Sequence, residues 1–145
     1  MPTSVERIDT EEGWDAAVPI IRQLWSHEDE EFVRSWREED DYQLYGLYDT
    51  AADDPDHDDL VAVAGVSIQR VLHHVRHAWI HDFVVDEPYR GEGNGAALLA
   101  WVEDWARERD CEYVALACTD ENDAGREFYE AQELAVWGQV MEREL

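Results

Sequence analysis

The chain has 145 residues, and its 36 Asp and Glu against 11 Lys and Arg give a formal net charge of −25, with arginine as every one of those cations. This charge disfavours nucleic acid as a partner, and a hydrophobic content of 45% with seven tryptophans excludes a disordered acidic tail. Because the carboxylates are spread along the whole chain, we interpret them as an adaptation to a salty cytoplasm, where molar salt shortens the Debye length to about 3 Å, rather than as a surface for one cationic partner.

Apolar periodicity over the first seventy residues predicts a strand, two amphipathic helices and two more strands. They span residues 4–8, 15–25, 28–37, 42–48 and 60–70. The acidic stretch Asp49 to Asp59, which contains Pro55, is predicted to be a hairpin loop between the last two strands. Pro19 falls in the early turns of the first helix, where proline is tolerated.

The remainder of the chain predicts a strand, a long helix, a strand, a short helix and a last strand. They span residues 79–85, 95–109, 113–118, 123–130 and 135–143. The buried stripe of the long helix is predicted to contain Leu98, Leu99, Val102, Trp105 and Ala106. This order of elements indicates an α+β (mixed α/β) fold around one central sheet, and the absence of repeats or linkers predicts a single domain over residues 1–145.

The ends and the cysteines of the chain predict its surroundings. The N-terminal sequence MPTSVERIDTEEGWD has no basic-then-apolar leader, and no apolar run reaches the length of about 18 residues that spans a bilayer. We therefore expect a cytoplasmic protein without a membrane partner. Cys111 and Cys118 are too few for a disulfide framework and are interpreted as buried free thiols.

The segment RGEGNGA, from Arg90 to Ala96, is the most informative in the chain. Its alternating glycines allow a tight turn, and the N–H groups that open the following helix would face phosphate oxygens at the positive end of the helix dipole. A glycine-rich turn without a ligand is one alternative. A nicotinamide-binding loop is another, because Gly91 to Ala96 fits G-x-G-x-x-A, although about ninety residues precede it. A P-loop is excluded because the chain has no lysine.

The longer string, Val-Val-x-x-Pro before Arg-x-x-Gly-x-Gly and Ala-Leu-Leu after it, resembles the GNAT superfamily of N-acetyltransferases over about residues 60–145. The resemblance implies a GNAT-like fold, a mostly antiparallel twisted sheet of about six to seven strands flanked by about four helices. It implies that acetyl-CoA is the co-substrate and that its pyrophosphate binds at Arg90, Gly91, Gly93, Asn94, Gly95 and Ala96. It also implies that the backbone of Phe83, Val84 and Val85 pairs with the pantetheine arm, on a strand with a bulge whose N–H polarises the thioester carbonyl.

A second block, NDAGREFY from Asn122 to Tyr129, is similar to the family's Asn-x-x-Ala-x-x-Phe-Tyr. This similarity implies that Tyr129 is the general acid for the departing thiolate and that Asn122 contacts the cofactor. Without the motif, Tyr129 would be interpreted as a core aromatic residue beside Phe128. Two departures concern this end of the chain: Gly125 stands where alanine is usual, and Glu133-Leu134 replaces the family's usual Gly-Phe.

The attacking amine has a pKa near 10 and must lose a proton, so the reaction needs a base. Asp82 matches an acidic position frequent in the family and is the first candidate, with His81 second; strand alternation places them on opposite faces. Alternatively, Asp82 only anchors a nearby loop. His73, His74, His77 and His81 are dense in the sequence, but only His77 and His81 share a strand face, and no metal is expected.

These features predict an acetyl-CoA-dependent N-acetyltransferase in which a primary amine of a small molecule or peptide attacks directly in a ternary complex. The alternative is a non-catalytic acyl-CoA-binding sensor or partner module with the same fold. Leu72-His73-His74 followed by Trp79-Ile80 resembles aminoalkylphosphonate N-acetyltransferases, in which case Arg70 or Arg76 would bind the phosphonate. The helices and loop around Trp25 to Trp36 are expected to shape the acceptor pocket, but they carry no recognisable signature, so the identity of the acceptor stays open. A homodimer stays open too, since dimers are common in the family.

Overall fold

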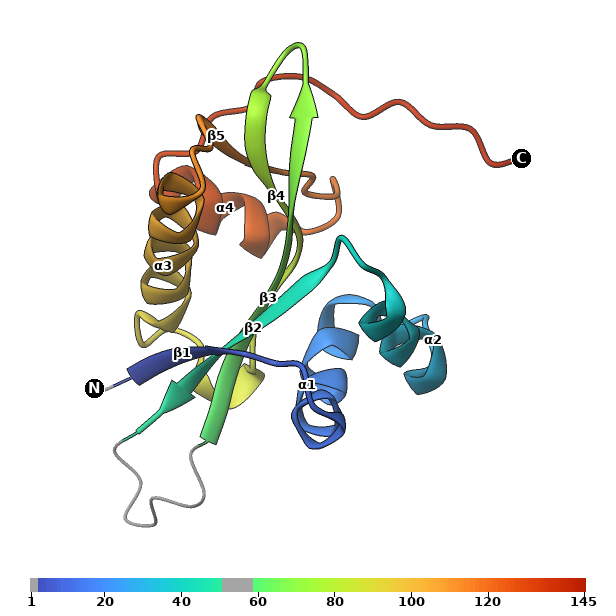
Figure 1. Cartoon of the computed structure of the whole chain (residues 1–145), viewed down its shortest axis with the longest axis vertical. Helices are drawn as coiled ribbons and strands as arrows, with labels where there is room; N and C mark the ends of the chain where they lie inside the picture. The colour runs from blue at the N-terminus through green and yellow to red at the C-terminus, as the bar shows by residue number, and fades with distance from the viewer. Residues whose placement is uncertain (1–2, 51–58) are drawn as a thin grey trace. The chain divides into compact units, whose positions relative to one another are not determined.

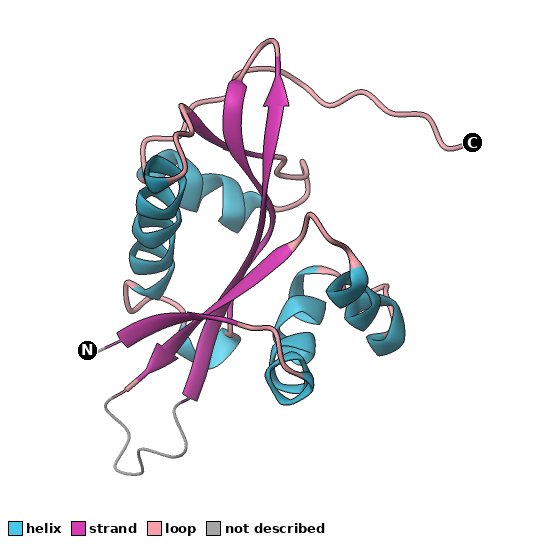
Figure 2. Cartoon of the chain, in the orientation of Figure 1, coloured by secondary structure: helices cyan, strands magenta, loops and turns pink. Residues whose placement is uncertain are grey.

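The protein is described from a computed structural model, which covers residues 3–50 and 59–145. The chain forms two compact units, residues 1–115 and residues 116–145, and each is described by itself. Figure 1 traces the chain, and Figure 2 shows its helices and strands. Most of the acidic hairpin loop predicted at Asp49 to Asp59 lies outside the described residues.

A five-stranded sheet in the order β1-β2-β3-β4-β5 organises the described chain. Its strands are β1 (Thr3–Arg7), β2 (Gln43–Asp49), β3 (Asp59–Val71), β4 (Val75–Val85) and β5 (Tyr113–Leu116). The first three pairings are antiparallel, and the sheet is partly parallel, so β5 runs parallel to β4. The mixed α+β fold is thus confirmed, but the prediction of six to seven strands is wrong.

The strand predicted at residues 135–143 accounts for the difference. In the second unit, the segment that follows α4 (Asp123–Ala131) has no regular secondary structure. Its large apolar side chains are exposed, among them Trp137 at 69% and Met141 at 92%. Alternating apolar residues define the two faces of a strand, but a strand also needs a neighbour for its backbone N–H and C=O groups.

Three helical segments precede β2, and one long helix follows β4. They are α1 (Glu11–Leu24), α2 (Glu30–Arg34), the short 3-10 helix η1 (Ser35–Glu38) and α3 (Asn94–Glu108). The first helix begins four residues before its predicted start, because the Thr10 hydroxyl accepts a 3.0 Å hydrogen bond from the backbone N–H of Gly13. Pro19 therefore lies in the middle of the helix rather than in its early turns.

The sheet of the first unit is covered on both faces, by α1 and α2 on one side and α3 on the other (Figure 1). Trp14 and Val18 of α1 pack with Leu44, Val63 and Val84 in one continuous core. On the α3 side, the predicted stripe is buried as expected: Leu98, Leu99, Val102, Trp105 and Ala106. Burial of these stripes supplies most of the stability of the unit and fixes α1 against the C-terminal half of β4.

Candidate active site

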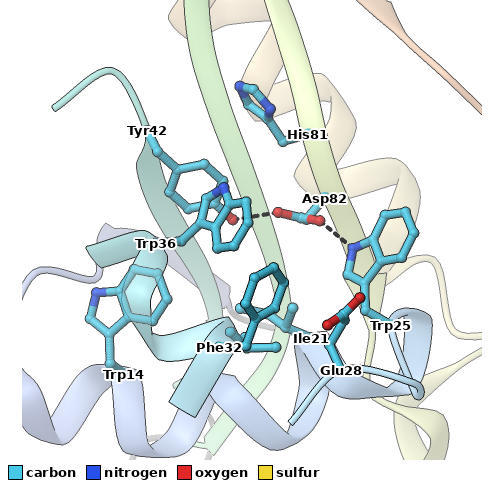
Figure 3. A pocket seen from close by; sticks show the side chains of 10 residues that line it. Trp14, Ile21, Trp25, Glu28, Phe32, Trp36, Tyr42, His81 and Asp82 are labelled. Atoms are coloured by element: carbon cyan, nitrogen blue, oxygen red, sulfur yellow. Dashed lines mark hydrogen bonds between the residues drawn. The ribbon is translucent and has the colours of Figure 1, made fainter. Parts of the chain in front are cut away.

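A cavity of about 280 Å³ lies in the first unit, between the helices α1 and α2 with η1 and the strand β4 (Figure 3). Its lining is mostly aromatic and apolar, with two carboxylates and one imidazole. The lining residues are Trp14, Ile21, Trp25, Glu28, Phe32, Val33, Trp36, Tyr42, His81 and Asp82. The cavity therefore contains both residues that were predicted as candidate bases.

A β-bulge in β4 brings His81 and Asp82 to the same cavity. Gly65 pairs with Asp82 while the next residue, Val66, pairs with Ile80, so His81 is an extra residue in the ladder. The bulge implied by the family resemblance is present. The prediction that His81 and Asp82 point to opposite faces is wrong, because simple alternation fails where a residue is inserted.

Both carboxylate oxygens of Asp82 accept hydrogen bonds from neutral donors. The Tyr42 hydroxyl donates to Oδ2 at 2.6 Å, and the indole N–H of Trp25 donates to Oδ1. Burial and the adjacent Asp82 raise the pKa of Tyr42 well above its usual value, so the phenol keeps its proton. These donors hold the carboxylate in one orientation at the cavity wall, and they also tie the end of α1 to β4.

His81 is half-buried and lies beside Tyr42, with the two ring centroids 5.4 Å apart. Its Nε2 atom lies 2.7 Å from the Ser67 hydroxyl oxygen. Burial lowers the pKa of His81 from its usual value, and the charge of Asp82 opposes this shift only in part. The imidazole is therefore neutral at neutral pH and can accept a proton.

The sequence placed the substrate pocket around Trp25 to Trp36, but it assigned no individual role to Trp25 or Glu28 and did not include Tyr42. In the sequence, the aromatic residues between Trp25 and Tyr42 fit the apolar faces of helices and a strand, which is their ordinary role. One signal was available. Trp25 is 39% exposed and Phe32 45% exposed, so these large apolar side chains are only partly covered by the core.

The loop between β4 and α3 has the backbone that its glycines predict. A short 3-10 helix, η2 (Glu87–Tyr89), leads into it, and Gly91 and Gly93 have φ angles of +79° and +86°. Such left-handed angles strain any residue with a Cβ atom. A Cβ added at either glycine would have no atom within 4 Å, so these glycines are required for conformation and leave open space above the turn.

The first turn of α3 presents unpaired backbone N–H groups. Gly93 caps the helix without a side-chain hydrogen bond, and no acidic residue lies in the first turn. Among the α-helices of the described residues, α1, α2 and α4 each carry acids there. The backbone N–H groups of Asn94, Gly95 and Ala96 therefore remain available as hydrogen-bond donors to an anion. The positive end of the helix dipole lies at the same place and also favours an anion.

Two predicted loop residues have their side chains engaged in the loop itself. Asn94 is 4% exposed, and its Nδ2 donates to the Tyr89 carbonyl at 3.0 Å, which closes the turn. Arg90 donates through Nε to the Val85 carbonyl and through Nη2 to Oε1 of Gln23, both at 2.9 Å. These bonds use two of the five guanidinium N–H groups and hold the Arg90 side chain over the loop.

Gln23 connects α1, which lines the cavity, to this loop. Besides binding Arg90, its Oε1 accepts from the backbone N–H of Glu87 at 3.1 Å. Its Nε2 donates to Oδ1 of Asp86 at 2.6 Å. One amide side chain thus fixes both the start of η2 and the guanidinium of Arg90, an arrangement that the sequence did not indicate.

The strand β4 has different neighbours before and after the bulge. The backbone N–H of Glu112 donates to the Arg76 carbonyl at 2.8 Å, so β5 begins beside the N-terminal part of β4. The four residues of β5 extend, in parallel, to about the level of Ile80. Beyond the bulge, Phe83, Val84 and Val85 pair with Ala64, Val63 and Ala62 of β3.

In the second unit, Asn122 and Tyr129 belong to α4 and its cap. Oδ1 of Asn122 accepts a 2.9 Å hydrogen bond from the backbone N–H of Gly125, so this amide serves as the N-cap. A Cβ at Gly125 would lie 2.4 Å from Nδ2 of Asn122, which explains the glycine where alanine is usual. Burial, with a smaller effect of Cys118, raises the pKa of Tyr129 far above its usual value, so the phenol carries its proton at neutral pH.

Histidine rings cluster on the β3–β4 hairpin. The rings of His73 and His74 lie 4.6 Å apart, and those of His74 and His77 lie 5.2 Å apart. In residues 3–50 and 59–145, however, no group of three or more His, Cys, Asp or Glu side chains could hold a metal ion. Over the same residues, no helix is both long and apolar enough to span a bilayer, and Cys111 and Cys118 are free thiols that are only partly buried.

The sequence matches a known family over most of its length. The profile of the acetyltransferase (GNAT) family matches residues 11–133. The chain is also 26% identical to YhdJ of Bacillus subtilis (strain 168), described as an uncharacterized N-acetyltransferase, over 129 residues, which is 86% of each chain.

Solved structures share the fold at lower sequence identity. The aminoglycoside N-acetyltransferase AAC(6')-Iy in complex with CoA superposes with a TM-score of 0.80 at 15% identity, over 99% of this chain and 95% of that one. AAC(6')-Iy in complex with a bisubstrate analogue, CoA-S-monomethyl-acetylneamine, gives a TM-score of 0.77 at 16% identity, over 100% of this chain and 99% of that one. The fold of the chain is therefore the fold of these acetyltransferases.

Proposed function

Because the chain belongs to the GNAT family of acetyltransferases and is an acyltransferase, we propose that it transfers an acetyl group from acetyl-CoA to the primary amine of a small molecule. The observation that carries the proposal is the turn at Gly91 and Gly93, which leads into a helix whose first turn carries no acid. In a chain of net charge −25, this is a favourable place for a diphosphate. Acetyl-CoA supplies the acetyl group as a thioester.

We propose that the pyrophosphate accepts hydrogen bonds from the backbone N–H groups of Gly91 to Ala96 and from the free guanidinium N–H groups of Arg90. The pantetheine arm then pairs with the backbone of β4 at Phe83 to Val85, and Asn122 supplies a further contact. A protein with a net charge of −25 repels an anionic cofactor over most of its surface. Binding of the pyrophosphate therefore depends on hydrogen-bond donors that point at it. The N–H of the bulge polarises the thioester carbonyl.

We propose that the amine enters the cavity beside Asp82, whose fixed carboxylate binds and orients the ammonium. His81, neutral at neutral pH, accepts the proton, and the nitrogen lone pair then attacks the thioester carbon. Of the two candidate bases, Asp82 thus binds the ammonium and His81 accepts its proton. Because both oxygens of Asp82 already accept hydrogen bonds, it is better suited to hold a cation than to take the proton.

The bond between carbon and sulfur breaks as the bond between carbon and nitrogen forms, and no covalent link to the enzyme is needed. We propose that the departing thiolate takes the proton of the Tyr129 hydroxyl, and that the second proton lost by the attacking nitrogen converts the Tyr129 phenolate back to the phenol. Burial raises the pKa of Tyr129, so the phenol carries its proton at neutral pH but is a weak acid beside a thiol with a pKa near 8.5. The transfer therefore requires direct contact between the phenol and the sulfur in the ternary complex.

We further propose that residues 1–145 act as one domain, because the family match runs across both units, from residue 11 to residue 133. The net charge of −25 supports the proposal that the protein functions in a cytoplasm of high salt concentration. A homodimer is compatible with this proposal.

The experiment is an assay of free thiol release from acetyl-CoA in molar KCl, run against a panel of primary amines. Turnover is expected with at least one amine. Asp82→Asn should raise the amine KM, His81→Gln and Tyr129→Phe should lower kcat, and Glu103→Gln on the outer face of α3 serves as the matched control. Binding of CoA without turnover of any amine would instead support the non-catalytic acyl-CoA-binding module, for which no comparison gives support.

A further inference from the structure

The walls of the cavity are aromatic to an unusual degree for a polar amine. Five of the ten lining residues are Trp14, Trp25, Phe32, Trp36 and Tyr42. Phe32 and Trp36 meet edge to face, with ring centroids 4.9 Å apart, and Trp14 and Tyr42 lie 6.2 Å apart. The close view shows these rings around a common space (Figure 3). Such walls stack on a flat apolar body and offer few partners to a hydroxyl group.

The charged residues of the cavity are all of one sign. Glu28 and Asp82 line it, whereas no arginine does, and the chain has no lysine. The Glu28 carboxylate has no ion pair within the described residues, and it lies next to Trp25 in the close view. A cation placed between two carboxylates and the faces of aromatic rings is stabilised by both, while an anionic group would meet only repulsion.

The cavity is also small. Its volume of about 280 Å³ lies at the lower limit of pockets that enclose drug-sized ligands, which span roughly 300–1,000 Å³. One ring with a short arm fits such a volume. A molecule of several sugar rings with several ammonium groups would leave most of its hydroxyls outside or against aromatic walls.

We infer that the acceptor is a small arylalkylamine, with one ammonium group on a short arm and one flat apolar ring. This inference rests on the proposed function, because it takes the cavity beside Asp82 as the acceptor site. The ammonium lies at Asp82 with Glu28 as a second attraction, and the ring lies among Phe32, Trp36 and Trp14. Glu28, Trp36 and Phe32 are then specificity residues of the site.

An aminoalkylphosphonate does not meet these conditions. Arg70 and Arg76, which the sequence offered as phosphonate ligands, pair with each other near the β3–β4 turn, and neither lines the cavity. A phosphonate beside Asp82 would therefore face carboxylates without a compensating cation.

The test compares binding and turnover of four named compounds by the wild-type protein with CoA or acetyl-CoA. 2-Phenylethylamine is the expected ligand, and 2-phenylethanol has the same shape without the charge. Neamine and 2-aminoethylphosphonate represent the aminoglycoside and phosphonate classes. Calorimetry with CoA measures affinity independently of transfer, and thiol release from acetyl-CoA measures turnover.

We expect 2-phenylethylamine to bind at least about tenfold more tightly than the other three compounds, since each lacks the ring, lacks the cation or adds groups that the cavity does not match. Equal or tighter binding of neamine, 2-aminoethylphosphonate or 2-phenylethanol overturns the inference. Tight binding of 2-phenylethylamine without turnover of any amine supports the inferred ligand class and overturns the proposed transfer. Turnover of neamine alone supports the proposed transfer and overturns the inferred ligand class.

Two matched substitutions test whether the electrostatic attraction of the ammonium comes from Glu28 in the cavity. Glu28→Gln should weaken 2-phenylethylamine binding about fivefold and leave 2-phenylethanol unchanged, because it removes only a charge. Glu31→Gln, three residues further along in the first turn of α2 and outside the lining, should change neither. Both positions are exposed, so neither variant threatens folding. An equal effect of the two substitutions would show general surface charge rather than a site, and would overturn the role of Glu28.

Discussion

The phenol oxygen of Tyr42 lies where residue 65 would carry its Cβ atom: an ideal Cβ built on Gly65 would be 1.9 Å from it. Gly65 is also the residue of β3 that pairs with Asp82, directly beside the bulge. The absence of a side chain on β3 thus gives Tyr42 the space from which its hydroxyl binds Asp82. One glycine on a neighbouring strand determines how the carboxylate is held.

Gly65→Ala should therefore lower kcat/KM for the amine by about tenfold to a hundredfold. The added methyl group displaces the Tyr42 ring, and a hydrogen bond to a charged group contributes about 1.5–3 kcal/mol. Steady-state kinetics of the variant checks this, with Gly138→Ala as control because a Cβ there meets no atom within 4 Å. Unchanged kinetics in a folded Gly65→Ala protein would mean that the bond between Tyr42 and Asp82 has no role.

Gln23→Met should raise the KM for acetyl-CoA by about fivefold to thirtyfold with a smaller change in kcat. Methionine keeps the shape of the side chain but loses the bonds to Arg90, Glu87 and Asp86, so the phosphate loop is no longer fixed in advance. Gln69→Met, on an exposed part of β3, is the matched control. A loss of kcat at unchanged KM would contradict a positioning role in cofactor binding.

The pH profile of kcat/KM should have an acid limb below about pH 6.5. Because burial lowers the pKa of His81, its neutral, proton-accepting form persists below the usual range, and activity falls only as pH drops through that lowered pKa. Asp82, Glu28 and Tyr42 are the other titratable groups of the cavity, and Tyr42 stays protonated throughout. His81→Gln should lower the plateau and remove this limb; a limb that persists unchanged would assign it to a carboxylate.

Thermal stability should rise with salt. A net charge of −25 on 145 residues opposes the compact state at low ionic strength, and molar KCl screens this repulsion. We expect the midpoint of thermal unfolding to rise by more than about 5 °C between 0.1 M and 3 M KCl, since each 1 kcal/mol shifts a domain of this size by about 2–4 °C. A flat or falling midpoint would contradict the adaptation to salt.

The regular elements were predictable because their signals are local. The long helix was predicted at residues 95–109 and spans Asn94–Glu108, since its apolar stripe and the preceding glycines define both its face and its start. The short helix predicted at 123–130 ends one residue later, at Ala131. The strand predicted at 135–143 is absent because alternation in a sequence does not specify a partner strand.

The site was predictable only where a motif carries it. The loop residues from Arg90 to Ala96 follow from spacing and resemblance, and the structure gives their backbone the expected turn. The cavity beside Asp82 was predictable only as far as the segment around Trp25 to Trp36, because its geometry depends on contacts across the fold: Trp25 to Asp82 spans 57 residues and Tyr42 to Asp82 spans 40. The bulge at His81 also changes which face of β4 the following side chains occupy, and the alternation of residues in the sequence does not predict such a bulge.

The most direct measurement is calorimetric titration of CoA and of pantetheine, which lacks the phosphates, into the wild-type protein and into Gly93→Ala. The left-handed φ of Gly93 and the open space above it are what the diphosphate requires, so the substitution should weaken CoA binding by at least about tenfold and leave pantetheine binding unchanged. If Gly93→Ala binds CoA as tightly as the wild-type protein does, or if the wild-type protein does not bind CoA, the account is contradicted.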